Sequence, residues 1–77
     1  MQSHLPKGSM LAPESIPLND ASKSELMELP GVGAATADRI IAFRELHSFR
    51  SIDEIKKVKT IGDARFNRMK SYLRLKR

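Results

Sequence analysis

The stretch Leu29-Pro30-Gly31-Val32-Gly33 decides how this chain of 77 residues folds. Pro30 discourages continuation of a preceding helix, and Gly31 and Gly33 permit backbone angles that are closed to other residues. Val32, between the two glycines, can enter a core between two helices. The stretch is therefore predicted to be a rigid, tight turn that joins one helix to the next.

The turn belongs to a unit that occurs twice in the chain, at a spacing of 29 residues. The shift superimposes Ser22 on Ser51, Glu25 on Glu54, Leu26 on Ile55, Leu29 on Val58, Val32 on Ile61, Gly33 on Gly62, Arg39 on Arg68, Ile40 on Met69 and Phe43 on Tyr72. Apolar positions fall on apolar positions, and the capping and turn residues fall on themselves. The pattern indicates one supersecondary unit used twice.

Each unit is predicted to be a helix, a turn and a second helix. Ser22-x-x-Glu25 and Ser51-x-x-Glu54 have the spacing of capping boxes, in which the serine oxygen accepts a first-turn N–H and the glutamate accepts the serine N–H. The first helices are expected to end at residues 30–31 and 59–60.

The second helices are expected over residues 34–46 and 63–73. Their predicted buried residues are Ala37, Ile40, Ile41, Phe43, Phe66, Met69 and Leu73. The predicted fold is all-α, with two helical hairpins of four to five helices in all, related by approximate two-fold symmetry. Strands are not expected, because the composition includes only three Phe and one Tyr.

The composition excludes several classes of site. No cysteine is present, so a disulfide framework, a thiolate nucleophile and a cysteine-ligated zinc are ruled out. Two histidines are too few for a histidine-rich metal site, and neither a metal nor a cofactor is expected. The longest apolar run, residues 40–43, is far shorter than the roughly 20 residues of a membrane span, so no membrane contact by this segment is expected.

Both ends of the chain are expected to lie outside the domain. Residues 1–15 have proline and glycine and no periodic apolar face, so they are predicted to be a disordered leader. Gly8-Ser9-Met10 resembles a cloning junction, which would make part of the leader non-native. The domain is expected over residues 16–74, and residues 75–77 are interpreted as a basic tail.

Positive charge is concentrated in the C-terminal half. Residues 1–38 carry two bases and five acids, or −3, and residues 39–77 carry twelve bases and four acids, or +8, which together give the net charge of +5. Such a distribution favours a polyanionic partner, although a solvated charged face would have the same composition.

The first turn has the chemistry of an anion site. Gly31 and Gly33 carry no side chain, and Ala34 and Ala35 carry only methyls. Another molecule can therefore approach the N–H groups that open the next helix, at its positive end. This suits a phosphodiester oxygen, and no base-reading group projects from the turn.

Leu29-Pro30-Gly31-Val32-Gly33-x-x-x-Ala37-x-x-Ile40 resembles the helix-hairpin-helix motif of non-sequence-specific DNA-binding proteins. Over about residues 16–74, the chain resembles the DNA-receptor domain of the bacterial competence proteins of the ComEA family. In that family two hairpins hold phosphates of both strands of duplex DNA across the minor groove. The resemblance implies binding of double-stranded DNA during DNA uptake. It also implies a periplasmic or extracytoplasmic location, the alternative being the cytoplasm. The domain is expected to be monomeric in isolation.

The resemblance also implies which residues contact phosphate. They are Gly31, Val32, Gly33, Ala34 and Ala35 in the first turn, and Thr60, Ile61, Gly62, Asp63 and Ala64 in the second. The nearby Lys59, Arg65 and Arg68 are expected to add binding through side-chain charge. The second turn departs from the motif, because Lys59-Thr60 replaces Pro-Gly and Asp63 adds a carboxylate. Asp63 is expected to cap the next helix rather than to bind a ligand, and its charge would still repel phosphate. Lys59, Arg65 and Arg68 can offset that charge. Ala34-Ala35 lacks the lysine that many relatives carry there, which predicts weaker binding.

Other interpretations stay open at the level of sequence. The glycines can serve a purely structural turn, and Arg39 and Arg44 can either bind phosphate or pair with Asp38 and Glu45. The domain is not expected to be an enzyme, since no catalytic constellation is evident. It can instead be an accessory DNA-binding module of a repair or processing enzyme, or a module for protein interaction or dimerisation.

Overall fold

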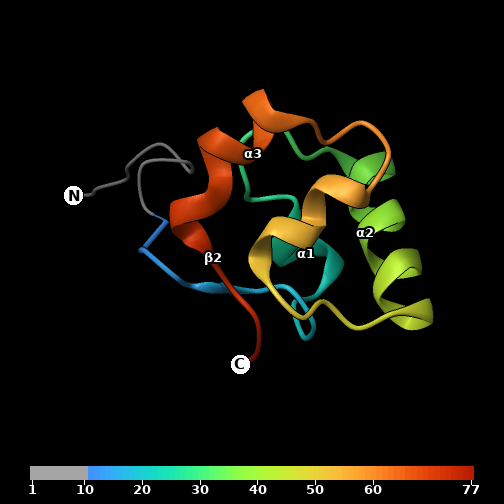
Figure 1. Cartoon of the computed structure of the whole chain (residues 1–77). Coiled ribbons are helices and arrows are strands. Elements are labelled where there is room, and N and C mark those ends of the chain that lie inside the picture. Colours follow the sequence, from blue (N-terminus) through green and yellow to red (C-terminus); the bar gives the residue numbers. More distant parts are fainter. Residues whose placement is uncertain (1–10) are drawn as a thin grey trace.

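The computed structural model describes residues 11–77, and this part of the chain is mostly helical (Figure 1). The elements are β1 (Ile16–Pro17), α1 (Lys23–Leu26), α2 (Ala34–Leu46), the 3₁₀-helix η2 (Ile52–Lys57), α3 (Asp63–Met69), the 3₁₀-helix η3 (Lys70–Tyr72) and β2 (Leu73–Arg74). The predicted all-α class is confirmed, and α2 has the predicted bounds. The predictions of disorder and of a cloning junction within residues 1–10 lie outside the described residues.

The first predicted capping box is present. The Ser22 hydroxyl accepts the Glu25 N–H at 3.1 Å, and the Ser22 N–H donates to Glu25 Oε1 at 2.8 Å. The helix that it opens is shorter than predicted, because α1 ends at Leu26 and turns carry the chain on to Leu29.

The second predicted capping box is not formed, which corrects the prediction. The first element of the second unit is a 3₁₀-helix, so the Glu54 N–H donates to the Ser51 carbonyl at 3.2 Å and is not available to the Ser51 hydroxyl. The Glu54 carboxylate instead accepts the Arg50 N–H at 2.7 Å, and this hydrogen bond lowers the pKa of Glu54. The same sequence pattern therefore gives two different helix starts.

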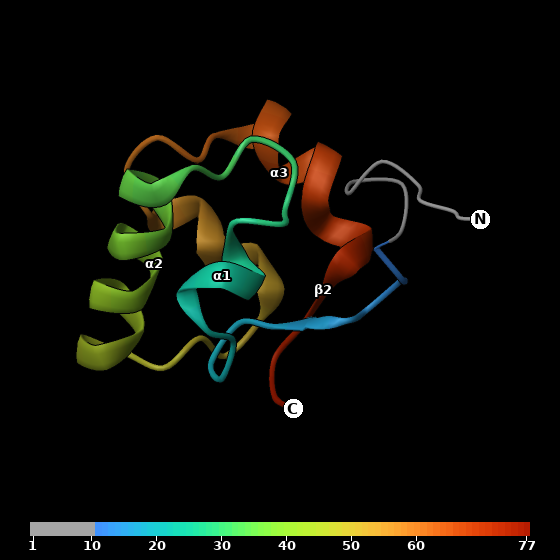
Figure 2. The same cartoon turned by 180° about the vertical axis from the view of Figure 1, so that it is seen from behind.

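The expectation of no strands was also wrong, in a small way. β1 and β2 form a parallel pair with Ile16 opposite Leu73 and Pro17 opposite Arg74 (Figure 2). The ladder continues through the Leu18 N–H, which donates to the Arg74 carbonyl at 2.7 Å. Because the two ends of the domain run side by side, their backbone groups satisfy one another.

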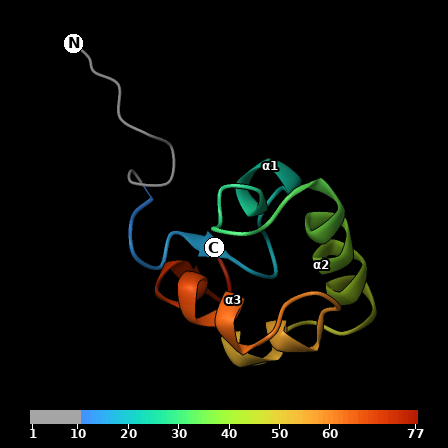
Figure 3. The same ribbon diagram turned by 90° about the horizontal axis from the view of Figure 1, so that it is seen from above.

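One apolar core joins the two units, and the helical elements lie around it (Figure 3). Its buried members are Ile16, Leu18, Ala21, Leu26, Leu29, Val32, Ala37, Ile40, Phe49, Ile55, Val58, Ile61, Phe66, Met69 and Leu73. Of the residues predicted to be buried, only Ile41 and Phe43 are partly exposed. Leu29 and Val32 of the first turn and Val58 and Ile61 of the second lie in this core, so core packing fixes both turns.

Contacts begin before residue 16, contrary to the expectation of a disordered leader as far as residue 15. Leu11 packs against the core, and the Glu14 N–H donates to the Ser71 carbonyl at 2.9 Å. At the other end, the expected basic tail folds back onto the first unit. The Arg77 N–H donates to Asp20 Oδ2 at 2.7 Å, and its guanidinium lies 2.8 Å from Glu25 Oε1.

Acid is expected to loosen this end of the domain. The hydrogen bond from Arg77, together with the Ser22 N–H, lowers the pKa of Glu25 from 4.5 to about 2. A lowered carboxylate pKa stabilises the fold fully above pH 4.5, and this contribution is lost as the pH falls toward 2. Urea unfolding between pH about 6 and about 2 should show this loss, and Arg77→Gln should reduce it. The matched control is Lys76→Gln, and equal effects of the two variants would contradict the assignment.

Candidate functional site

The two turns have the same backbone structure. Gly31 and Thr60 occupy equivalent positions, with φ of 82° and 80°. In the first turn the Val32 N–H donates to the Leu29 carbonyl at 3.1 Å, and in the second the corresponding bond, from Ile61 to Val58, is 3.0 Å. The sequence departure at Lys59-Thr60 therefore changes the side chains of the second turn and leaves its backbone unaltered.

Each turn ends in a glycine that caps the next helix without a side chain. Gly33 precedes α2 with φ −97° and ψ −171°, and Gly62 precedes α3 with φ −101° and ψ −170°. Neither helix has a side-chain cap, so the N–H groups of residues 34–36 and 63–65 find no acceptor within residues 11–77. Such groups at a helix start attract an anion.

The space over both caps is open. A Cβ atom added at Gly33 or Gly62 would meet nothing within 4 Å, and both residues have ordinary extended backbone that other amino acids adopt. The fold itself thus does not require glycine at either position. The buried side chains of Val32 and Ile61 anchor the two turns in the core. Ala34, Ala35 and Ala64 at the helix starts are exposed, and their methyl groups leave the N–H groups accessible.

The two turns lie next to each other along one edge of the domain, the upper edge in Figure 1. Arg65 Nη1 on α3 donates to the Gly31 carbonyl in the first turn at 2.6 Å. Thr36 Oγ1 on α2 lies 3.3 Å from Thr60 Oγ1 in the second turn. The structure therefore brings together the two sets of residues that the sequence places in separate turns.

Two predicted charge roles need correction. Asp63 does not cap α3, because Gly62 holds the cap position and Asp63 begins the helix. Its carboxylate is 86% exposed and pairs with Lys56 Nζ at 3.3 Å. The sequence did not indicate Lys56 as the partner of Asp63. Its ammonium also lies 5.2 Å from the centre of the Phe66 ring. Arg65 was expected to offset Asp63, but it contacts the first turn.

The arginines of α2 and α3 differ in their contacts. Asp38 pairs with Lys23 at 3.1 Å, and Arg44 donates to the Leu18 carbonyl at 3.0 Å. Arg39, like its repeat partner Arg68, is exposed and makes no ion pair within residues 11–77. Both follow an exposed alanine of the helix start by four residues, and so lie on the same helix face as that alanine. Arg39 therefore joins the predicted site residues.

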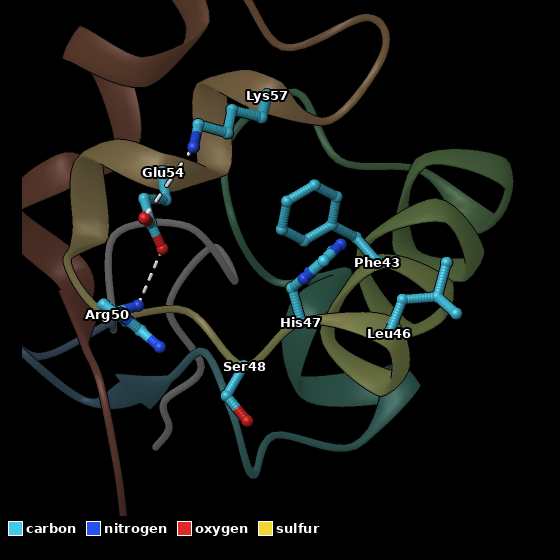
Figure 4. A pocket seen from close by; sticks show the side chains of 7 residues that line it. All are labelled: Phe43, Leu46, His47, Ser48, Arg50, Glu54 and Lys57. Carbon is cyan, nitrogen blue, oxygen red and sulfur yellow. Dashed lines mark hydrogen bonds and ion pairs between the residues drawn. The ribbon is translucent and has the colours of Figure 1, made fainter.

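A separate groove of about 620 Å³ opens at the far end of α2 (Figure 4). It is lined by Phe43, Leu46, His47, Ser48, Arg50, Glu54 and Lys57, none of which is a predicted site residue. Leu46 is 80% exposed, and the Phe43 ring stacks on Phe49 with 5.0 Å between centres.

Within residues 11–77, no three His, Asp or Glu side chains gather closely enough to hold a metal ion. In the same part of the chain, no helix has the length and apolar character needed to cross a membrane.

Replacing Thr60 by glycine is expected to raise the free energy of unfolding by about 1 kcal/mol, because a β-branched residue is strained at positive φ. This expected gain in stability already allows for the loss of the Thr60 hydroxyl contact with Thr36. The reverse change at the equivalent position, Gly31→Thr, should destabilise the domain, since its Cβ would also lie 3.1 Å from Arg65 Nη1. Urea unfolding measures both. Equal stabilities for the three proteins would show that the backbone at these positions is not strained.

Comparison with known proteins gives consistent matches. Residues 12–74 match the model of the helix-hairpin-helix motif family. The chain is 40% identical over 60 residues to ComE operon protein 1 of Bacillus subtilis, covering 77% of this chain and 29% of that protein. It is 31% identical over 62 residues to endonuclease/exonuclease/phosphatase family domain-containing protein 1 of Xenopus laevis, covering 79% of this chain and 11% of that protein. It thus spans less than a third of either relative.

Proposed function

Because the chain belongs to the helix-hairpin-helix family, we propose that residues 16–74 bind double-stranded DNA without sequence preference. In this proposal, N–H groups at the two helix starts donate to phosphate oxygens, which positions the domain without reading bases. The observation that carries the proposal is the open space at Gly33 and Gly62, two glycines that the fold does not itself require. We call the exposed N–H groups of each helix start, residues 34–36 and 63–65, a phosphate cradle. Because no side chain covers a cradle, the backbone of another molecule can approach it closely.

The surrounding charges support a polyanionic ligand. Arg39 and Arg68 extend the two cradles by one helical turn each, and Lys59 lies exposed beside the second. Long, exposed cations of this kind attract phosphate without demanding a particular base. The two cradles differ, since Arg65 adds a cation to the first and Asp63 adds a carboxylate to the second, where Lys56 partly neutralises it. The first turn is therefore the stronger phosphate site in this proposal.

Fluorescence anisotropy with a duplex of about 20–30 base pairs, at two salt concentrations, tests this function. With about 2–6 phosphates contacted, the slope of log affinity against log salt should lie between about −2 and −5, with affinity in the micromolar range or weaker at physiological salt. The matching single strand should bind less tightly, and changing the duplex sequence should have little effect. No binding, or equal binding of single and double strands, would contradict the proposal.

DNA uptake during competence is the setting that we propose for this binding, on the basis of the similarity to ComE operon protein 1. The domain then acts as a binding module and not as a catalyst, with its location outside the cytoplasmic membrane. A role as an accessory module of a larger DNA-processing protein is the alternative, and the similarity to the Xenopus protein favours it.

Protein interaction is the rival function, and the groove beside the exposed Leu46 favours it. The groove is at the opposite end of the 13-residue α2 from Gly33, about 20 Å along the helix. If this rival is correct, sizing should show oligomers, and binding to polyanions should not depend on the glycines of the turns.

A further inference from the structure

The two turns are tied to each other by a pair of contacts that follow the internal repeat. Arg65 on α3 reaches the Gly31 carbonyl, and Thr36 on α2 reaches the Thr60 hydroxyl. The two contacts are equivalent in the repeat: Thr36 corresponds to Arg65 and Thr60 corresponds to Gly31, each pair being 29 residues apart. In each unit the third residue of the long helix therefore contacts the turn of the other unit.

These reciprocal contacts are unequal in strength. The contact between Thr36 and Thr60 joins two exposed, neutral hydroxyls at 3.3 Å. That from Arg65 is a charged donor at 2.6 Å from a backbone carbonyl, which is a stronger class of hydrogen bond. The carbonyl belongs to Gly31, the residue of the first turn with φ of 82°. Arg65 thus holds the first turn at its residue with positive φ.

We propose that Arg65 is a positioning residue that locks the first turn against the second helix hairpin, so that the two turns bind DNA as one rigid unit. The inference rests on the proposed function of the turns. A guanidinium has five N–H donors, so binding one carbonyl leaves other donors and the positive charge beside the first turn. Two linked sites held at a fixed separation bind a two-phosphate ligand more tightly than two independent ones.

The repeat supplies a matched control on the same helix. Arg68 lies three residues after Arg65, carries the same charge and makes no hydrogen bond to the first turn. Arg65→Met and Arg68→Met therefore remove the same charge from α3, and only the first breaks the lock. A direct phosphate contact predicts similar behaviour of the two variants, whereas positioning predicts different behaviour.

The first measurement needs no DNA. Amide hydrogen exchange of Val32 and Ala37, whose N–H groups donate to the Leu29 and Gly33 carbonyls, should become about fivefold faster in Arg65→Met and should be unchanged in Arg68→Met. About fivefold is the factor expected for loss of one hydrogen bond. Equal exchange in the two variants would overturn the positioning role. This result does not depend on whether the turns bind DNA.

The second measurement is a double-mutant cycle on duplex affinity at about 50 mM salt, where weakened variants still bind. Arg65→Met should weaken binding about tenfold in the wild-type background and less than about twofold when Gly33→Asp already blocks the first turn. Arg68→Met should weaken both backgrounds by the same factor. Equal factors for Arg65→Met in both backgrounds would overturn the proposal. If Gly33→Asp alone binds like wild type, the proposed function fails, and hydrogen exchange alone then decides the role of Arg65.

Discussion

Gly33→Asp is expected to weaken binding of duplex DNA by at least about tenfold while leaving the domain at least as stable as before. The backbone at Gly33 is in the extended region that suits an aspartate cap, and its added Cβ meets nothing within 4 Å. The new carboxylate would accept the free N–H groups of the helix start, which typically adds stability relative to an uncapped start. The same carboxylate would occupy the phosphate position and repel DNA. Anisotropy and thermal unfolding of the same samples separate the two effects.

A second carboxylate variant controls for the change in net charge. Ser48→Asp adds the same charge at the exposed groove, away from the turns. It should reduce DNA affinity only slightly, through long-range electrostatic repulsion, which salt screens. If Ser48→Asp weakens binding as much as Gly33→Asp, the loss is one of overall charge and the first turn is not the phosphate site. Gly62→Asp should have a smaller effect than Gly33→Asp, because Asp63 already weakens the second site.

Asn19→Ala is expected to destabilise the domain by about 2–4 kcal/mol, a large share of the stability of so small a core. The Asn19 side chain donates to the Phe49 carbonyl at 3.0 Å and accepts the Phe49 N–H at 2.8 Å. These bonds hold the connector between the two hairpins, where the Phe49 ring is buried. Alanine would leave both partly buried backbone groups unpaired.

Asn19→Asp is the matched variant, because it keeps the acceptor for the Phe49 N–H and loses the donor to the Phe49 carbonyl. Its stability in urea unfolding should lie between those of wild type and Asn19→Ala. If all three proteins unfold at the same urea concentration, the connector is held by apolar packing alone.

The local features of the fold could be predicted from the sequence. The α2 bounds, the Ser22 cap and the turn at Gly31 each follow from residues within a few positions of one another. The repeat extended this information, because the second turn copies the backbone of the first even where Thr60 replaces glycine. Apolar periodicity was enough to place most of the core.

The features that sequence reasoning missed are contacts between distant segments. Nothing near Arg65 indicates a partner 34 residues earlier, and nothing near Asn19 indicates one 30 residues later. The Lys56 pair with Asp63 and the parallel strands also form only once the two units have packed together. The candidate site was therefore predicted as two separate turns, and their connection through side chains emerged from the tertiary structure.

The central claim is that the N–H groups at the two helix starts bind phosphate. Titration of the ¹⁵N-labelled domain with a duplex, followed by amide chemical shifts, tests it most directly. We expect the largest shifts at residues 33–36 and 62–65, with those of the first turn saturating at lower DNA concentration. Shifts concentrated around the groove at Leu46, or confined to lysine and arginine side chains while these amides stay unchanged, would contradict the claim.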